Sequence, residues 1–356
     1  SLFLFYEIYT YFSYAPKTIK LEEEITLPQE SRQGDKALPN IYYIVFDSYT
    51  NFESLEKYWD FDNSGLKYFL QNRGFYVAPK SKSNYNQTHF AMASAFNLSY
   101  LDFKLFDKLT LAHYPYLFKL IKENALVRIL EKNGYEIINY SLFDISKEEK
   151  YYRFEITDAP NFFTNTLFEG LINTNFLGVE LGLNLETELN IIQTNLNIKN
   201  LLMDVPKRKT EQNFFVYAHF MLPHPPYFFD ADGNQMSYEY SKDHSNQWKY
   251  LEQLKFANKI IKEVVDSILI NSSEAPVIII QGDHGFRFLK DDIMQAAESH
   301  TILNAFYFPS RDYSALYPSI SAVNTFRVLL NKYNFLEIEN LPNEIFYVAK
   351  GIKLDY

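Results

Sequence analysis

Two uninterrupted apolar runs limit most strongly how this chain can fold. Residues 41–46 (IYYIVF) and 277–280 (VIII) contain only aliphatic and aromatic side chains. Runs of this length are typical of strands and are too short for most helices. Because neither run alternates apolar with polar residues, we expect both faces of each strand to be buried, as in a parallel sheet that is covered by helices on both sides.

A repeating order of helix, glycine and strand supports the same architecture. Helical patterns over residues 66–72 and 125–132 are each followed by a glycine and then by a strand pattern, over 75–77 and 135–140. This alternation is typical of βα units. Further strands are predicted over 214–220 and 303–308 and near Ile345, and further helices over 163–202, 250–270 and 323–333. We therefore predict an α/β fold, a three-layer sandwich with a mostly parallel central sheet.

The composition excludes several classes of protein. Of the 356 residues, 47% are hydrophobic and 22% are charged, which is typical of a globular chain rather than a disordered one. The net charge of -10 leaves no basic surplus to neutralise phosphates, so we expect no nucleic-acid partner. The absence of cysteine rules out disulfides, thiolate metal ligands and a cysteine nucleophile.

The first 15 residues are apolar and aromatic but include Glu7. They are too short to span a bilayer, which takes roughly 20 apolar residues, and they lack the basic start of a signal peptide. Three interpretations are open: the end of a membrane anchor cut from a longer protein, an amphipathic surface helix, or a helix packed against the domain. We predict a linker over 16–39, the main domain over 40–310 with a helical insertion over 160–205, and an extension packed on that domain over 311–356.

Residues with metal-binding chemistry lie at the ends of three predicted strands. Asp47 directly follows the first apolar run, and Asp283 and His284 follow the second. His219 and His224 flank the end of the strand over 214–220. In open α/β sheets, sites form beyond the carboxyl ends of the strands. Aspartates and histidines that converge there suit one divalent cation, Zn²⁺ or Mn²⁺.

Thr88 opens an alanine-rich segment that is predicted to be a helix. A helix N-terminus presents free N–H groups and the positive end of the helix dipole, which suits a phosphate. A hydroxyl there, beside a bound cation, can lose its proton and act as a nucleophile. Structural interpretations are also open: Thr88 as a helix N-cap, His219 as a core histidine, Asp47 or Asp283 as a turn residue, and His224 or His300 as a histidine with a purely structural role.

Four motifs in this order resemble the sulfatase-like branch of the alkaline phosphatase superfamily. They are Asn40-Ile-Tyr-Tyr-Ile-Val-Phe-Asp47, Ser83-Asn-Tyr-Asn-Gln-Thr88, His219-x-x-x-x-His224-Pro-Pro and Asp283-His284-Gly285. The resemblance covers residues 39–309 and extends to the membrane-anchored lipoteichoic acid synthases and phosphoethanolamine transferases. It implies an alkaline-phosphatase-like fold for the catalytic domain over residues 40–310.

The resemblance implies a role for each residue at the strand ends. Thr88 would be the nucleophile that becomes phosphorylated. Asp47, Asp283 and His284 would be ligands of one divalent metal ion, and the Thr88 oxygen would complete the set. One departure concerns Asp47, because the transferases use the longer Glu there, so the metal position is expected to differ slightly.

The remaining site residues follow from the same resemblance. His224 would contact the phosphoryl group or the leaving oxygen, with His219 beside it as ligand, acid or orienting group. His300 and Arg287 would bind substrate, although Arg287 stands where the transferases place Glu-Ser, which leaves the donor head group open. Sulfatases carry Cys or Ser followed by x-Pro-x-Arg, for conversion to formylglycine, where this chain has Thr88-His-Phe-Ala. Sulfate ester hydrolysis is therefore disfavoured.

These observations predict a sulfatase-like transferase or hydrolase. The preferred function is transfer of a phospho-alcohol group, of phosphoglycerol or phosphoethanolamine type, from a phospholipid or other phosphodiester donor to a cell-envelope glycan or lipid. Two alternatives are open: a phosphodiesterase or phosphatase with the same site, and a non-catalytic domain that binds envelope glycan or a partner protein. A lipid donor implies a membrane surface and an extracytoplasmic location, periplasmic or on the outer face of the cytoplasmic membrane.

Overall fold

In the computed structural model of the chain, the structure describes residues 19–27, 38–102, 113–146, 184–241, 243–289, 291–348 and 352–354. The predictions for residues 1–15 and for 160–183 of the insertion lie outside these ranges. Among the described residues, no helix has both the length and the apolar character that a membrane crossing requires.

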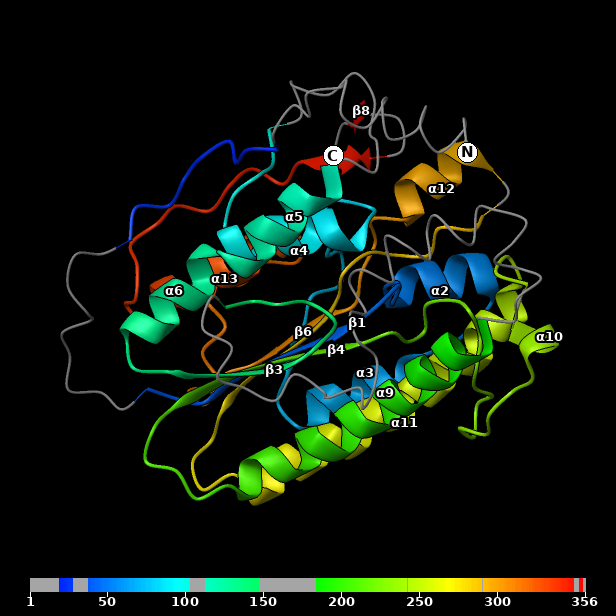
Figure 1. The fold of residues 1–356 in the computed structure, drawn as a ribbon, viewed down its shortest axis with the longest axis horizontal. Helices are drawn as coiled ribbons and strands as arrows, with labels where there is room; N and C mark the ends of the chain where they lie inside the picture. Colours follow the sequence, from blue (N-terminus) through cyan, green and yellow to red (C-terminus); the bar gives the residue numbers. More distant parts are fainter. Residues whose placement is uncertain are drawn as a thin grey trace, which may run out of the picture.

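A six-stranded sheet forms the centre of the molecule (Figure 1). Its strands, in the order β2-β6-β5-β1-β4-β3, are β2 (Tyr76–Val77), β6 (Asn304–Tyr307), β5 (Val277–Gly282), β1 (Ile41–Phe46), β4 (Phe214–Phe220) and β3 (Glu136–Tyr140). The pairs β1–β4, β1–β5 and β3–β4 are parallel, whereas β6 runs antiparallel to β5 and β2. The predicted α/β class with a mostly parallel sheet is confirmed.

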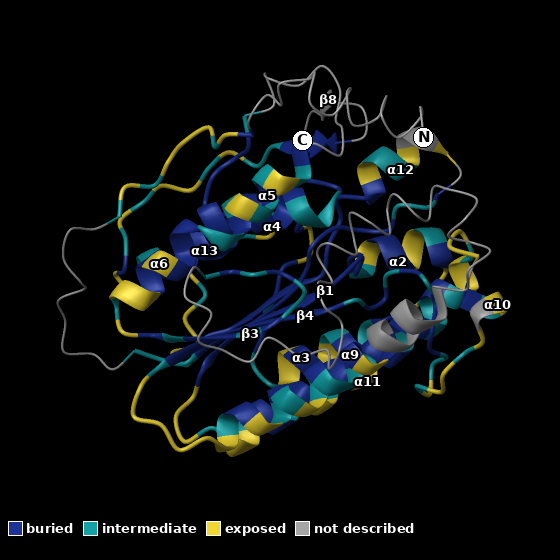
Figure 2. Ribbon diagram, in the orientation of Figure 1, coloured by how far each residue is buried: buried dark blue, intermediate teal, exposed yellow. Residues whose placement is uncertain are grey.

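Helices cover both faces of this sheet (Figure 1). One layer contains α4 (Thr88–Asn97), α5 (Tyr114–Lys122), α6 (Ala125–Lys132) and α13 (Ala322–Lys332), and the other contains α2 (Phe52–Trp59), α3 (Ser64–Asn72), α9 (Asn184–Asp204) and α11 (Gln247–Asn271). The remaining elements are η3 (Val205–Lys207), α10 (Tyr238–Ser241), α12 (Asp292–Glu298) and the hairpin of β7 (Ile345–Tyr347) and β8 (Ile352–Leu354). Figure 2 shows the buried residues on the strands and on the helix faces that turn toward them.

Strand β1 is buried on both faces, as its apolar sequence predicts. Tyr43 and Val45 pack in the core beneath α4 and α13, and Ile44 and Phe46 pack in the core beneath α2, α3 and α11. Each such side chain contributes about 1.5–3 kcal/mol through burial. Because successive side chains of a strand point to opposite faces, the alternation directs Asp47, the next residue, toward the layer that contains α4.

A buried arginine fixes the C-terminal end of α4. Arg327 of α13 is 2% exposed. Its Nε donates to the carbonyl of Leu98 at 2.6 Å, its Nη1 donates to the carbonyl of Glu339, and its Nη2 contacts Glu23 Oε2 at 3.2 Å. Glu23 belongs to residues 19–27, so part of the segment predicted as a linker packs on the fold beside α4.

We expect Arg327→Met to lower the free energy of unfolding by about 3 kcal/mol, because a buried acceptor left without its donor costs about 1–3 kcal/mol and Arg327 serves two carbonyls. Glu23 is largely exposed and is rehydrated at little cost. Denaturant titration measures the change. Arg128→Met, at an exposed position of α6, is the control and should change stability little. An equal loss in both variants would contradict the stabilising role of the hydrogen bonds that Arg327 donates.

Candidate active site

Three parallel strands end at the same level and bring the predicted residues together. Phe46, the last residue of β1, lies opposite Phe220 of β4 and Gly282 of β5. Asp47 and Asp283 directly follow β1 and β5, and the Asp47 N–H donates to the Phe220 carbonyl at 2.9 Å. The predicted convergence at the carboxyl edge of the sheet is therefore present.

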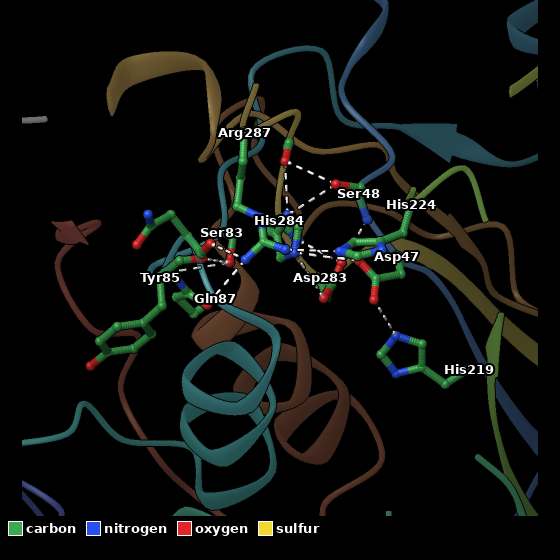
Figure 3. Close-up of polar contacts among 12 residues, drawn as sticks. Asp47, Ser48, Ser83, Tyr85, Gln87, His219, His224, Asp283, His284 and Arg287 are labelled. Carbon is green, nitrogen blue, oxygen red and sulfur yellow. Dashed lines mark hydrogen bonds and ion pairs between the residues drawn. The ribbon is translucent and has the colours of Figure 1, made fainter. Parts of the chain in front are cut away.

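The acidic and imidazole side chains form a buried cluster (Figure 3). Asp47, His224 and His284 make one group and Asp47, His219 and Asp283 a second, and within each group the possible ligand atoms lie within 4.8 Å of one another. His284 Nε2 lies 3.3 Å from Asp47 Oδ1 and 3.6 Å from Asp283 Oδ2, and His219 Nε2 lies 3.8 Å from Asp47 Oδ2.

The unpartnered atoms of this cluster fit a cation. Asp47 Oδ1, Asp283 Oδ2 and His284 Nε2 are buried and have no hydrogen-bond partner among the described residues. These are the same three atoms that face one another. The donor atoms on a tetrahedral Zn²⁺ lie roughly 3.3 Å apart, which agrees with the separations in the cluster. Oxygen and imidazole ligands of this kind suit Zn²⁺ or Mn²⁺.

The backbone around Asp283 orients these atoms. Asp283 Oδ1 accepts the N–H groups of Ser48 at 3.0 Å and of His284 at 2.8 Å, so Oδ2 is the oxygen that is left for a cation. His284 Nδ1 donates to the Gly285 carbonyl at 2.8 Å, which leaves the Nε2 lone pair facing the carboxylates. Ser48 adopts a φ of 66°, unusual for a residue other than glycine. No sequence pattern identifies Ser48 as a site residue.

Gly282 and Gly285 permit close packing rather than a special turn. A Cβ on Gly282 would lie 2.5 Å from the Tyr49 carbonyl oxygen, and one on Gly285 would lie 2.2 Å from that of Glu298. Neither glycine is among the residues with a positive φ. Both glycines are therefore needed for close backbone contact.

The two aspartates have opposite protonation tendencies. Burial and the neighbouring charge of Asp283 raise the pKa of Asp47 well above its usual value. Burial also acts to raise the pKa of Asp283, but His284, His219, Thr88 and the Ser48 N–H outweigh it and lower that pKa. In the metal-free cluster Asp47 is thus the carboxyl that holds a proton most readily, which relieves repulsion between two buried charges.

The histidines of the cluster are neutral at neutral pH. Burial lowers the pKa of His219 and of His284 to about 4, with Arg287 adding to the effect at His284. Burial and the charge of Arg287 lower the pKa of His224 well below its usual value. Neutral imidazoles offer the lone pair that a metal ligand needs.

Thr88 is the first residue of α4, as predicted, but it is not the helix N-cap. The N-cap is Gln87, whose side chain makes no capping bond. Thr88 lies close enough to both Asp47 and Asp283 for its side chain to lower the pKa of each carboxyl group. The structure therefore combines a helix N-terminus, a hydroxyl and a cation-binding cluster at one point.

Arg287 links the segment before Thr88 to His224 (Figure 3). Its Nη1 donates to Gln87 Oε1 at 3.0 Å and to the Asn86 carbonyl at 3.4 Å, and its Nη2 donates to His224 Nε2 at 2.8 Å. Because arginine only donates, His224 must accept at Nε2 and carry its proton on Nδ1. That Nδ1 is buried without a partner among the described residues.

His300 lies outside both groups of possible metal ligands. Its Nδ1 lies 2.7 Å from the Ala296 carbonyl and its Nε2 lies 3.1 Å from the Phe346 carbonyl. Both ring nitrogens therefore face the backbone, and burial lowers the pKa of this histidine to about 4. The structure brings the other predicted residues together and does not bring His300 among them.

Tyr217 is a site residue that sequence reasoning missed. Its hydroxyl lies 2.7 Å from His219 Nδ1, on the side of the imidazole opposite Asp47. The two residues share a face of β4 because they are two positions apart, which is the one signal that could have identified Tyr217. Partners of this kind fix the ring orientation of a metal-ligating histidine.

Comparisons with known proteins agree with the fold. The family model described as "Sulfatase" matches residues 70–326, whereas no curated protein matches. The C-terminal periplasmic domain of EcEptC from Escherichia coli, solved also in complex with Zn, has a TM-score of 0.52 at 9% identity, with 86% of each chain covered.

Two further solved structures share this fold. Lipooligosaccharide phosphoethanolamine transferase A (EptA) from Neisseria meningitidis, an integral membrane protein, has a TM-score of 0.53 at 11% identity over 92% of this chain and 60% of that one. BT1596, a 2-O GAG sulfatase, has a TM-score of 0.50 at 12% identity over 85% and 72%. At these identities the likeness concerns the fold alone.

Proposed function

Because the chain belongs to the sulfatase family of hydrolases and transferases, we propose that it is a metal-dependent phosphoryl-group transferase that acts through a covalent phosphothreonine at Thr88. It would move a phospho-alcohol group, of phosphoglycerol or phosphoethanolamine type, from a lipid donor to a cell-envelope glycan or lipid. One observation carries the proposal: the residue at the start of helix α4, next to the cluster of Asp47 and Asp283, is a threonine. A threonine has no route to the formylglycine that sulfatases use.

Asp47, Asp283 and His284 would hold the cation, with the Thr88 oxygen as a further ligand and His219 adjacent. A bound Zn²⁺ or Mn²⁺ would supply positive charge that favours the deprotonated hydroxyl and offsets the charge on the phosphoryl oxygens. Because Asp47 is one methylene shorter than the Glu of the transferases, we expect the cation to lie slightly closer to the end of β1.

The residues of the chain divide the transfer into two steps. Thr88 Oγ would attack phosphorus in line, so that a Thr88–phosphorus bond forms while the bond to the leaving oxygen breaks. The proton of the Thr88 hydroxyl would pass by way of Asp47 to the leaving oxygen. His224 Nδ1–H, which has no partner among the described residues, would donate to a phosphoryl or leaving oxygen, and preorganised donors of this kind stabilise developing charge. In the second step an acceptor hydroxyl would attack the phosphothreonine, so that a bond from the acceptor oxygen to phosphorus forms while the Thr88–phosphorus bond breaks, and the acceptor's proton would pass to Thr88 Oγ.

Intact-mass measurement tests the function. The chain is incubated with Mn²⁺ or Zn²⁺ and with phosphatidylglycerol or phosphatidylethanolamine, first without and then with a sugar acceptor. A metal-dependent adduct at Thr88 supports the covalent mechanism, and its mass identifies the transferred group. Loss of the adduct to water alone would instead favour the phosphodiesterase or phosphatase, and neither adduct nor bound metal would favour the non-catalytic binding domain.

The proposal includes a place for the domain in the cell. A lipid donor requires a membrane surface, and we propose an extracytoplasmic location with residues 1–15 as the end of a membrane anchor. In this layout residues 16–39 connect the anchor to the catalytic domain over 40–310, and residues 311–356 form its extension. The acidic composition argues against a nucleic-acid partner.

We expect Arg287→Met to lower kcat/KM by about 100-fold, the loss that follows removal of one charge-stabilising donor. Arg287→Lys should recover little of it, because a single ammonium group cannot bridge Gln87 and His224 as the guanidinium does. Steady-state kinetics measure the effect. Arg311→Met, at an exposed arginine, is the matched control, and full activity in Arg287→Lys would contradict the bridging role.

A further inference from the structure

Residues 344–348, here called the C-terminal strap, lie along residues 84–87, here called the nucleophile loop because they lead directly to Thr88. We propose that the strap is a positioning element for the nucleophile: it holds the loop so that the Thr88 hydroxyl stays aimed at Asp47 and Asp283. This inference rests on the proposed function for its catalytic consequence. Its structural basis is a continuous set of contacts on both segments.

The backbone of the strap pairs with the nucleophile loop. The Phe346 N–H donates to the Asn84 carbonyl at 2.8 Å, and Tyr85 and Phe346 form a parallel bridge. The Tyr85 and Phe346 rings stack with centroids 5.2 Å apart and planes at 13°. Tyr85 is fully buried, so the strap is part of the core beneath the loop rather than a loose end laid over it.

Two buried asparagines extend this pairing to the residues next to Thr88. Asn84 Nδ2 donates to the Glu344 carbonyl at 2.7 Å, while its Oδ1 accepts the Val323 N–H at 2.9 Å. Asn86 Oδ1 accepts the Val348 N–H at 2.8 Å. Asn86 is 3% exposed and lies two residues before Thr88, and its carbonyl also accepts a hydrogen bond from Arg287. It therefore joins the strap to a residue of the site itself.

The strap is in turn anchored on the far side. Gln295 of α12 donates from Nε2 to the Tyr347 hydroxyl at 3.2 Å. His300 lies between the carbonyls of Ala296 and Phe346, so it spans the end of α12 and the strap. This placement supports a positioning role for His300, whose contact with substrate, implied by the resemblance, stays a prediction.

Metal binding and the position of the nucleophile depend on different parts of the structure. The metal candidates Asp47, Asp283 and His284 follow strands β1 and β5, and the hydrogen bonds that orient them come from the ends of the strands and from Ser48. The position of Thr88, by contrast, depends on the nucleophile loop that precedes it, and the strap holds this loop. A shift of about 1 Å in a reacting group can cost about 100-fold in rate. Loosening the strap is therefore expected to slow transfer while metal binding persists.

Asn86→Ala in the full chain tests the proposal. It removes the acceptor of the Val348 N–H, and we expect the rate of adduct formation to fall by about 10- to 100-fold while the metal dissociation constant changes by less than about threefold. Asn84→Asp is the second variant: it keeps the shape and the acceptor for Val323 but loses the donor to Glu344. Hydrogen exchange of a peptide over residues 84–90 should be faster in both variants.

Asn124→Ala is the matched control. Asn124 is another fully buried asparagine, which caps α6 and donates to the carbonyls of Ile121 and Ile145. It should lower stability without changing adduct formation per folded molecule or exchange over 84–90. Unchanged exchange over 84–90 in Asn86→Ala and Asn84→Asp overturns the strap proposal. Faster exchange in those variants, with no adduct in any form of the protein, leaves the strap in place and overturns the proposed function instead.

Discussion

Thr88→Ala is expected to lower the rate of phosphoryl transfer by at least about 1,000-fold and to abolish the covalent adduct. The substitution removes the only atom of that side chain that can bond to phosphorus. Removal of a nucleophile from a covalent mechanism typically leaves only the rate supplied by binding and charge stabilisation. Single-turnover kinetics measure the rate, with the lipid that gives an adduct in the intact-mass experiment as the donor. Peptide mapping then locates the adduct in the chain.

Two variants make the Thr88 result specific. Thr88→Ser keeps a hydroxyl at the start of α4 and should retain a measurable adduct, now on serine. Thr194→Ala applies the same truncation at a buried threonine of α9, on the other face of the sheet, and should leave the rate per folded molecule unchanged. A Thr88→Ala protein that still carries the adduct would rule out Thr88 as the nucleophile.

The parts of the fold that follow from simple sequence patterns were predicted closely. Strands β1 and β5 are visible as apolar runs because both of their faces are buried. Asp47 and Asp283 could then be predicted to meet, since parallel strands place their carboxyl ends at one edge. The start of α4 at Thr88 followed from its alanine-rich sequence. In each case a local pattern determines the position of the residue.

The missed features depend on contacts between distant segments. Ser48 donates to Asp283 across 235 residues of chain, and Asn86 accepts from Val348 across 262. No periodicity encodes such pairs. His300 also makes a contact that its local sequence does not show. Its motif resembles a substrate-binding histidine, and its ring nitrogens lie near the carbonyls of Ala296 and of the distant Phe346. Predicting the strap would have required the position of β7 relative to α4.

Asp47→Asn is expected to have opposite effects on function and on the stability of the metal-free protein. The loss of a carboxylate ligand should weaken metal binding by at least about 100-fold, because changing a residue that merely supports a ligand already costs about 10- to 100-fold. Transfer should fall to a similar degree. The same change removes a buried ionisable carboxyl group that lies beside Asp283, and with it the cost of charging that group. The metal-free variant should therefore be at least as stable as the metal-free wild type at neutral pH.

The pH dependence of stability separates these two effects. Burial and the charge of Asp283 raise the folded-state pKa of Asp47 above its unfolded value of about 3.9. For a carboxyl with a raised pKa, the stabilising contribution is complete below the unfolded value and is lost as the pH rises through the folded value. The metal-free wild type should thus lose stability as the pH rises from the unfolded-state pKa of Asp47 through its folded-state pKa. Metal-free Asp47→Asn should lose less, because the substituted amide has no acidic proton to release.

Denaturant titrations of the metal-free proteins across this pH range, together with isothermal titration of Zn²⁺ and Mn²⁺, measure both effects. Asp266→Asn is the control: its ion pair with Arg73, at 2.8 Å, is more than a third exposed and should contribute less than about 1 kcal/mol. Equal metal affinity in Asp47→Asn and wild type would remove Asp47 from the ligand set. If wild type and Asp47→Asn lost the same stability as the pH rises, ionisation of Asp47 beside Asp283 would not be the cause of that loss.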